Sequence, residues 1–224
     1  MLRAVIFDVD GTLVNSVGAH VSSWVRAFHE HGIEIAERAV HEHAGNSGHR
    51  MVLDLLTGDE RARLGERIRA RAAALFDEYR AHVKPFPGVA ELIRRVHDTG
   101  RRVALASNSG DDEIRAYAAR MGVADVVDEV VGNGEVDHGK PWPQCFECAL
   151  ERLGVPAAQA IAVGDTPADV EAARRCGLAA IGLDSGGFGT DRLVAAGAVA
   201  VFHNAIALLE DFERSPLAAG KASR

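Results

Sequence analysis

The sequence has little of what marks secreted, membrane-spanning or nucleic-acid-binding proteins. Aromatic residues make up only 5% of the chain, so no platform for stacking single-stranded bases is evident. The formal net charge is −7, whereas surfaces that bind nucleic acid are basic. No stretch approaches the roughly 18 apolar residues of a membrane span, and the first apolar run, Ala4 to Phe7, is too short for the core of a signal peptide. We therefore expect a cytoplasmic protein, a monomer or weak homodimer, that binds neither nucleic acid nor membranes.

Cysteine is also scarce, and its placement gives no clear metal site. The three cysteines, an odd number, fit a reducing compartment. Cys145 and Cys148 have the C-x-x-C spacing, but no second pair is present to complete a zinc site. Two pairs of histidines are spaced by two residues: His29 with His31, and His41 with His43. Because residues spaced by two diverge on a helix, we interpret these histidines as solvated side chains.

The start of the chain carries the first chemical signal. The apolar run Ala4 to Phe7 is short enough to be a strand buried on both faces, and it stops at Asp8 and Asp10. Acids at the carboxyl end of such a strand lie where open α/β sheets bind ligands. A spacing of two residues aims both carboxylates to one side if the strand continues. The following Gly11 and Thr12 are also compatible with an ordinary turn.

Three later segments repeat the pattern of polar residues after an apolar run. Val103 to Ala106 ends in Ser107 and Asn108, which alone would also suit a helix N-cap. Lys140 stands before Pro141, where an exposed turn is the alternative. The third run ends in Asp165 and, one helical turn later, Asp169, which could equally be an acid favoured by the helix dipole.

Taken in order, Asp-x-Asp-Gly-Thr, Ser-Asn, Lys-Pro and Gly-Asp-Thr-x-x-Asp resemble the motifs of the haloacid dehalogenase superfamily of phosphohydrolases. The resemblance covers nearly the whole chain. It implies that Asp8 is a nucleophile that becomes an aspartyl phosphate and that Asp10 is the general acid and base. It also implies a Mg²⁺ ion, held by the side chains of Asp8 and Asp165 and by the backbone carbonyl of Asp10. Asp169 would support the metal. The expected phosphate-binding residues are Gly11, Thr12, Ser107, Asn108 and Lys140.

The order of the predicted elements indicates an α/β fold with an insertion. No strand pattern appears between Asp10 and Arg101, where helical spacing predicts helices over 14–31, 37–43, 49–56 and 59–79. Beyond residue 101, strands (102–107, 126–131, 160–164, 178–183 and 198–202) alternate with helices, which predicts a doubly wound, mostly parallel sheet, Rossmann-like by the resemblance. We expect a core of residues 1–15 and 83–214, an inserted α-helical cap of residues 16–82, and a flexible tail of residues 215–224.

The motifs also favour some branches of the superfamily over others. Dehalogenases lack the second acid and the Gly-Thr pair that are intact here. Phosphonoacetaldehyde hydrolases use a lysine of the cap, and this chain has no lysine before Lys84. A phosphatase of the phosphoglycolate type, acting on a small phosphorylated metabolite, is the leading hypothesis. A sugar phosphomutase similar to β-phosphoglucomutase shares every core residue. A non-enzymatic phospho-acceptor of the receiver type is a third possibility, although receivers carry no helical insertion.

One segment of the predicted cap mixes glycines, hydrogen-bonding side chains and a cation. It runs from Gly45 to Met51, between two short predicted helices. In related capped enzymes the corresponding segment faces the active site. We therefore expect Asn46, His49 and Arg50 to take part in substrate specificity, with a solvated helix start as the alternative.

Overall fold

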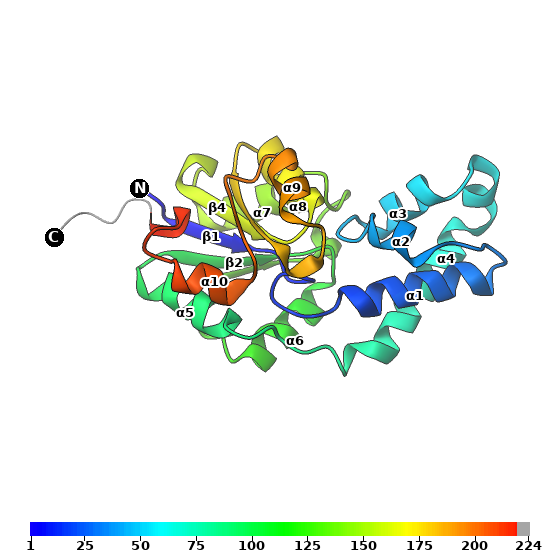
Figure 1. Cartoon of the computed structure of the whole chain (residues 1–224), viewed down its shortest axis with the longest axis horizontal. Coiled ribbons are helices and arrows are strands. Elements are labelled where there is room, and N and C mark those ends of the chain that lie inside the picture. Colours follow the sequence, from blue (N-terminus) through cyan, green and yellow to red (C-terminus); the bar gives the residue numbers. More distant parts are fainter. Residues whose placement is uncertain (219–224) are drawn as a thin grey trace.

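A computed structural model describes residues 1–218 of the protein. All paired strands of this part of the chain are parallel and form one six-stranded sheet in the order β3-β2-β1-β4-β5-β6. The strands are β1 (Ala4–Phe7), β2 (Arg102–Ala106), β3 (Glu129–Val131), β4 (Ala160–Gly164), β5 (Ala179–Leu183) and β6 (Ala200–Phe202). Helices cover both faces of the sheet, and a further group of helices lies beyond one end of it (Figure 1). The predicted doubly wound α/β fold is confirmed.

The order of the strands fixes where a site can form. From β1 the chain proceeds outward through β2 and β3, and it then returns to place β4, β5 and β6 on the other side of β1. In register, Phe7 at the end of β1 lies between Leu105 of β2 and Val163 of β4. The connection changes direction between β1 and β4, and crevices for ligands open at such points beyond the carboxyl ends of strands.

Alternating side chains of β1 reach two separate apolar layers, as expected for a strand buried on both faces. Val5 and Phe7 pack with α5 (Val89–Asp98), α6 (Asp111–Met121) and α10 (Ala205–Glu210). Ala4 and Ile6 pack with α7 (Gln144–Leu153), α8 (Pro167–Arg175) and α9 (Thr190–Ala196). The two layers hold β1 and β4 firmly at the centre of the sheet.

The inserted helices form an apolar cluster of their own. They are α1 (Val17–Glu30), α2 (Glu37–His41), α3 (Gly48–Leu55) and α4 (Gly58–Arg80), and we call them the helical unit. Phe28, Ile68 and Leu75 are fully buried within it. A capping box between Thr57 and Glu60 begins α4. Figure 1 places the helical unit beyond the end of the sheet to which β1 points.

Two linkers join the helical unit to the sheet, and they pair with each other. Val14 forms an antiparallel bridge with Pro85. The N–H of Asn15 donates to the carbonyl of Lys84 at 2.9 Å, and that of Phe86 donates to the carbonyl of Leu13 at 2.9 Å. Because Val14 is engaged in this pairing, helix α1 begins at Val17, later than the helix predicted from Val14.

Two further differences from the sequence-based expectations concern element ends. The strand predicted from Val126 begins at Glu129, because the N–H of Val126 donates to the carbonyl of Val123 in a turn after α6. The flexible tail predicted from residue 215 is wrong for residues 215–218. Pro216–Ala218 form a 3₁₀ turn, and Leu217 is fully buried in the layer with α5 and α10. The rest of that predicted tail, 219–224, lies outside the described residues. Within residues 1–218, no helix has both the length and the apolar character needed to cross a bilayer.

Candidate active site

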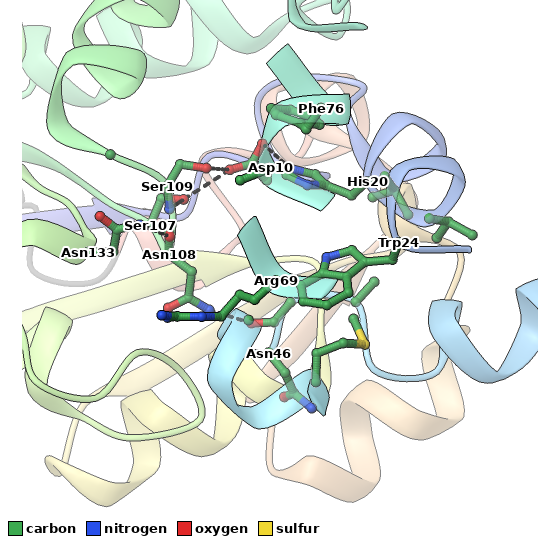
Figure 2. A pocket seen from close by; sticks show the side chains of 18 of the residues that line it. Asp10, His20, Trp24, Asn46, Arg69, Phe76, Ser107, Asn108, Ser109 and Asn133 are labelled. Atoms are coloured by element: carbon green, nitrogen blue, oxygen red, sulfur yellow. Dashed lines mark hydrogen bonds and ion pairs between the residues drawn. The ribbon is translucent and has the colours of Figure 1, made fainter. Parts of the chain in front are cut away.

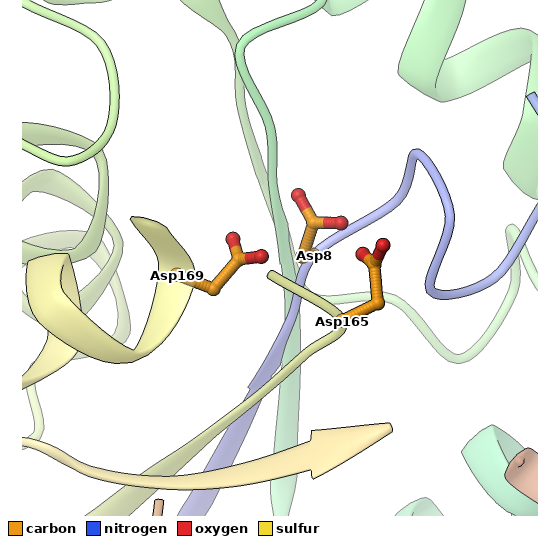
Figure 3. Close-up of side chains that lie close together, drawn as sticks. All are labelled: Asp8, Asp165 and Asp169. Atoms are coloured by element: carbon orange, nitrogen blue, oxygen red, sulfur yellow. The ribbon is translucent and has the colours of Figure 1, made fainter. Parts of the chain in front are cut away.

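Three carboxylates meet beyond the carboxyl ends of the two central strands. Asp8 follows β1, Asp165 follows β4, and Asp169 lies in the first turn of α8. One carboxylate oxygen from each lies within 4.8 Å of the other two (Figure 3). All three residues are buried, and none is more than 5% exposed. Such a cluster concentrates negative charge where water cannot screen it, and it therefore requires a cation.

Lys140 supplies one positive charge to this cluster. Its Nζ lies 2.6 Å from Oδ1 of Asp8, 2.7 Å from Oδ1 of Asp169 and 2.8 Å from the carbonyl oxygen of Ala106. Burial alone would lower the pKa of Lys140, but the charges of Asp169 and Asp8 raise it, so the ammonium stays charged. The ammonium donates hydrogen bonds to Asp8 and to the carbonyl of Ala106, and it forms an ion pair with Asp169. The structure therefore places Lys140 against Asp8, and phosphate binding by Lys140 stays a prediction.

Asp165 is held by a hydroxyl and closely flanked by two glycines. The Thr12 hydroxyl donates to its Oδ1 at 2.7 Å. A Cβ atom on Gly186 would lie 1.9 Å from Oδ2 of Asp165, and one on Gly11 would lie 2.2 Å from it. Gly11 also has φ +80°, which favours glycine. Within residues 1–218, Oδ2 of Asp165 accepts no hydrogen bond.

The donor set at the cluster fits a hard divalent cation. Burial first, and then the charges of Asp8 and Asp169, raise the pKa of Asp165 well above its ordinary range. Burial, followed by the charge of Asp169, also raises the pKa of Asp8, although Lys140 opposes this. A bound cation would reverse both shifts by compensating the charge that a single ammonium leaves unbalanced. The three converging side chains offer only oxygen atoms, the ligands that Mg²⁺ and Ca²⁺ prefer.

Asp169 has two structural tasks. Its Oδ2 accepts hydrogen bonds from the N–H and the hydroxyl of Thr166, at 3.0 and 2.6 Å, in a capping box that begins α8. Its Oδ1 lies beside Lys140. Both sequence-based interpretations of Asp169, as an acid of the helix N-terminus and as a support of the site, therefore fit its contacts.

Asp10 turns away from this cluster and accepts four hydrogen bonds. Its Oδ1 accepts from the Ser16 hydroxyl at 2.7 Å and from Nε2 of His20 at 3.2 Å. Its Oδ2 accepts from the hydroxyls of Ser107 and Ser109, at 3.0 and 2.7 Å (Figure 2). Burial alone would raise the pKa of Asp10. The hydrogen bond and the charge of His20, with hydrogen bonds from two of the serines, hold this pKa below its ordinary value.

His20 connects Asp10 to the helical unit. Its ring stacks on Phe76 of α4, with 3.8 Å between the ring centroids and 7° between the planes. His20 lies on α1, one helical turn after Ser16, so both side chains reach the same carboxylate. The position of α1 and α4 thus bears directly on the environment of Asp10.

The other predicted phosphate-binding residues have contacts of different kinds. The N–H of Gly11 donates to the carbonyl of Val14 within the loop after β1, whereas the Thr12 hydroxyl donates to Asp165, which follows β4. Ser107 lines the pocket while donating to Asp10. Asn108 also lines the pocket. For none of these residues does the structure test phosphate binding.

Asn108 joins the helical unit to the segment that carries Lys140. Its Nδ2 donates to the carbonyl of Gly45 at 2.8 Å, and its Oδ1 accepts from the backbone N–H of Lys140 at 2.8 Å. The N–H of Ser47 donates to the carbonyl of Lys140 at 3.0 Å. His41 makes another contact between the helical unit and the sheet: its Nε2 lies 3.0 Å from the carbonyl oxygen of Gly186. His41 is therefore a contact residue rather than the solvated side chain that the sequence suggested.

The three predicted specificity residues lie in different places. Asn46 lines the pocket. His49 is exposed and is not among the lining residues. Arg50 is not among them either, because its Nε pairs with Oδ2 of Asp54 at 2.8 Å, one turn along α3. The structure thus brings only Asn46 of the three to the pocket.

The pocket itself has a volume of about 470 Å³ and lies between the strand ends and the helical unit. Asp8, Asp10 and Asp165 line its inner end. Faces of α1 and α4 line its outer part. Sequence reasoning missed several of its residues, among them His20, Trp24, Arg69 and Ser109. Helical spacing from Ser16 was the signal for His20, and the repeat of serine two residues after Ser107 was the signal for Ser109.

Comparisons with known proteins agree with this geometry. A model of the haloacid dehalogenase-like hydrolase family matches residues 2–177. The phosphoglycolate phosphatase of Rhodospirillum rubrum is 29% identical over 211 residues, which cover 90% of this chain and 87% of that protein. The probable phosphatase IndB of Dickeya dadantii is 33% identical over 203 residues, covering 88% of this chain and 87% of that protein. Among solved structures, a hydrolase from Pseudomonas syringae matches with a TM-score of 0.85 and 28% identity, over 95% of this chain and 98% of that one. With a family model that spans most of its length and relatives that cover nearly all of it, the chain belongs to the haloacid dehalogenase-like hydrolase family.

Proposed function

We propose that this protein is a Mg²⁺-dependent phosphatase that hydrolyses a small phosphate monoester through an aspartyl phosphate on Asp8. The observation that carries the proposal is the contrast between two acids of one loop. Asp8 pairs with Lys140 beside two further carboxylates, whereas Asp10 accepts hydrogen bonds from serines and His20 on the opposite side. That contrast suits a nucleophile and an acid–base group. The phosphatases among the relatives support hydrolysis of a phosphate ester.

In the first step, an oxygen of Asp8 attacks the phosphorus and forms a P–O bond while the bond to the leaving alkoxide breaks. Asp10 gives its proton to that alkoxide. In the free protein the pKa of Asp10 is lowered. A bound phosphate dianion opposes this, because negative charge nearby favours the protonated carboxyl. Lys140 holds Asp8 in place and offsets its charge.

In the second step, water attacks the phosphorus of the aspartyl phosphate. Asp10, now a carboxylate, accepts the proton of that water, and inorganic phosphate leaves as Asp8 is restored. The four hydrogen bonds to Asp10 keep its carboxylate fixed between the two steps. Its side chain lies outside the carboxylate cluster, so its oxygens are not committed to the proposed metal.

Asp8 and Asp165 would hold Mg²⁺, with Asp169 in support and the backbone carbonyl of Asp10 as a further ligand. Mg²⁺ bound there supplies positive charge that offsets the repulsion between Asp8 and a phosphate dianion. Thr12 orients Asp165 for this purpose through its 2.7 Å hydrogen bond. We propose further that the helical unit, bounded near residues 16 and 82, is a cap over the site and carries the contacts to the rest of the substrate.

Two other functions share part of this arrangement. A sugar phosphomutase would use the same core residues, and a pocket of about 470 Å³ has room for a sugar ring. A receiver-type phospho-acceptor would not need a pocket enclosed by α1 and α4 above its aspartate. Dependence of turnover on a sugar bisphosphate activator would indicate the mutase, and rapid release of phosphate without it would indicate the phosphatase.

The proposal is tested by phosphate release from a panel of monoesters with Mg²⁺, using the wild type and Asp8→Asn. The amide cannot form the aspartyl phosphate, so turnover should fall more than tenfold while the circular dichroism spectrum is kept. Residual activity above a tenth of the wild-type rate would contradict Asp8 as the nucleophile.

A further inference from the structure

The outer part of the pocket is a chamber built by two helices. Its α1 wall carries Val21 and Trp24, and its α4 wall carries Arg69, Ala70 and Ala73. Val21 and Trp24 are three residues apart on α1, and Ala73 lies four residues after Arg69 and three after Ala70 on α4, so the residues of each helix share one face. In Figure 2 the indole of Trp24 projects from α1, and the Arg69 side chain extends from α4 towards the loop that carries Asn108. We call this part the leaving-group chamber.

The size of the pocket exceeds what a two-carbon acid requires. Cavities of about 300–1,000 Å³ ordinarily enclose ligands of drug size, and this pocket holds about 470 Å³. The phosphoryl group belongs at the inner end, beside Asp8. Ala70 and Ala73 line the α4 side, where their short side chains take up little of the space. The leaving group that fills such a chamber is larger than glycolate.

The charges of the chamber disfavour a carboxylate. Among the described residues that line the pocket outside the strand ends, the acids are Glu66, Asp77 and Glu113, against one guanidinium, Arg69. Nε and Nη2 of Arg69 lie 3.1 and 2.7 Å from Oε2 of Glu66, so these two charges offset each other, and no lining guanidinium is left for a ligand within the described residues. Asp77 pairs with Arg80 at 3.2 Å, and Glu113 makes no ion pair within the described residues. Burial first, and then the charge of Asp10, raise the pKa of Glu113. An anionic leaving group would meet repulsion, whereas a neutral or cationic one would not.

The surface of the chamber is apolar on one side and polar at its edge. Trp24, Val21 and Met51 offer an apolar side. Asn46 and Asp77 offer an amide and a carboxylate to the same pocket. A pyranose or cyclitol ring likewise has an apolar part and a polar part, since its C–H groups form an apolar face and its hydroxyls lie at the rim. Aromatic side chains bind such faces, while amides and carboxylates accept from hydroxyls.

We propose that the leaving-group chamber binds a hydroxylated ring of about sugar size, uncharged or cationic, with its apolar face against Trp24. The inference rests on the proposed phosphatase function and names the substrate class: a phosphate monoester of a pyranose or cyclitol, rather than of a small carboxylic acid.

The first measurement compares kcat/KM for four kinds of ester with Mg²⁺: glucose 6-phosphate and inositol 1-phosphate, glucosamine 6-phosphate, ethyl phosphate, and phosphoglycolate. At least one ring ester should exceed phosphoglycolate by tenfold or more. Phosphoglycolate turned over as well as or better than every ring ester would overturn the inference and leave the phosphatase proposal standing.

A wall variant tests the chamber itself. Ala73→Leu fills space on its α4 face, so the ratio of kcat/KM for the best ring ester to that for ethyl phosphate should fall at least tenfold. Ala74→Leu is the matched control, because Ala74 is an exposed alanine of the same helix that is not among the lining residues. An unchanged ratio in Ala73→Leu, or an equal fall in both variants, would exclude a ring in this chamber.

A binding measurement separates this inference from catalysis. The chain has two tryptophans, Trp24 and Trp142, and Trp142 is 47% exposed and is not among the lining residues. In a Trp142→Phe and Asp8→Asn double variant, a saturable change of Trp24 fluorescence is expected with the ring phosphate and not with phosphoglycolate. If the double variant gives this response but the wild type hydrolyses none of the esters, the leaving-group chamber is supported and the phosphatase proposal is refuted. No response to any ring phosphate would refute the chamber.

Discussion

The imidazole of His20 donates a hydrogen bond to the Asp10 carboxylate, with 3.2 Å between Nε2 and Oδ1. The donor belongs to α1, while the acceptor follows β1, so the contact crosses from the helical unit to the sheet. Stacking on Phe76 fixes the ring of His20 from the other side. The position of the helical unit and the pKa of Asp10 are therefore linked through this pair.

His20→Ala should therefore move the pH dependence of turnover. The variant loses a hydrogen bond and a charge that lower the pKa of Asp10, so that pKa should rise. Hydrolysis of an aryl phosphate needs Asp10 as a carboxylate in the second step, and this form is lost as the pH falls through the pKa. The acid limb of the pH–rate profile should shift to higher pH by about one unit, equivalent to ~1.4 kcal/mol.

The matched control is His29→Ala, which changes a histidine of the same helix that is 70% exposed. Its acid limb should stay in place. An acid limb that is the same in His20→Ala and the wild type would show that His20 does not act on Asp10.

The carboxylate cluster gives a prediction for the metal. Because Asp8, Asp165 and Asp169 repel one another, Mg²⁺ should raise the Tm of the protein, and EDTA should abolish turnover until Mg²⁺ is added back. Ca²⁺ should also raise the Tm but support little turnover, since its larger and more variable coordination misaligns the attack. Asp165→Asn should reduce the Mg²⁺-dependent rise in Tm. Full activity in excess chelator would contradict the metal assignment.

The fold and the centre of the site could be predicted because they depend on local patterns. Asp8 and Asp165 each follow a short apolar strand, and neighbouring parallel strands end at the same edge of a sheet. Thr166 and Asp169 form a capping box, which their spacing of three residues in the sequence indicates. Lys140 was recognisable from the motif order, although not its contacts with Ala106 of β2 and Asp169 of α8.

Contacts between the helical unit and the sheet were not predictable in the same way. His20, Trp24 and Arg69 face the pocket only because α1 and α4 lie beyond the strand ends, and no local pattern fixes that placement. Arg50 carried the expected charge and lay in the expected segment, but Asp54 one turn away pairs with it. Leu217 was assigned to a tail because nothing in the neighbouring sequence indicates the apolar layer that covers it.

Lys140 should contribute strongly to the stability of the metal-free protein. Lys140→Met removes the only ammonium that pairs with Asp8 and Asp169 within the described residues, and it leaves both carboxylates buried without compensation. Loss of one partner from a buried ion pair costs about 3–5 kcal/mol. Urea denaturation in EDTA should show a fall of that order in the free energy of unfolding, and Mg²⁺ should restore part of it.

Lys84→Met, at an exposed lysine, is the control and should change the free energy of unfolding by less than ~0.5 kcal/mol. A similar small change in Lys140→Met would mean that the cluster is not held by this ion pair.

Asn108 should matter for the docking of the helical unit rather than for the phosphate. Its amide donates to Gly45, and its side-chain oxygen accepts from the backbone of Lys140, so one side chain links the Gly45 segment to the lysine that holds Asp8. Asn108→Ala loses both hydrogen bonds, each worth roughly 0.5–1.5 kcal/mol. We expect kcat/KM for the best ester to fall about tenfold. Asn108→Asp keeps the acceptor for Lys140 but loses the donor for Gly45, so it should show an intermediate loss if docking is the cause.

A direct contact of Asn108 with the phosphate predicts another pattern. The Ki of inorganic phosphate would then rise in parallel with the loss of kcat/KM, and it would rise more for Asn108→Asp, because the charge of the aspartate repels the anion. An unchanged Ki for phosphate in Asn108→Ala, together with the graded loss of kcat/KM, would assign Asn108 to docking.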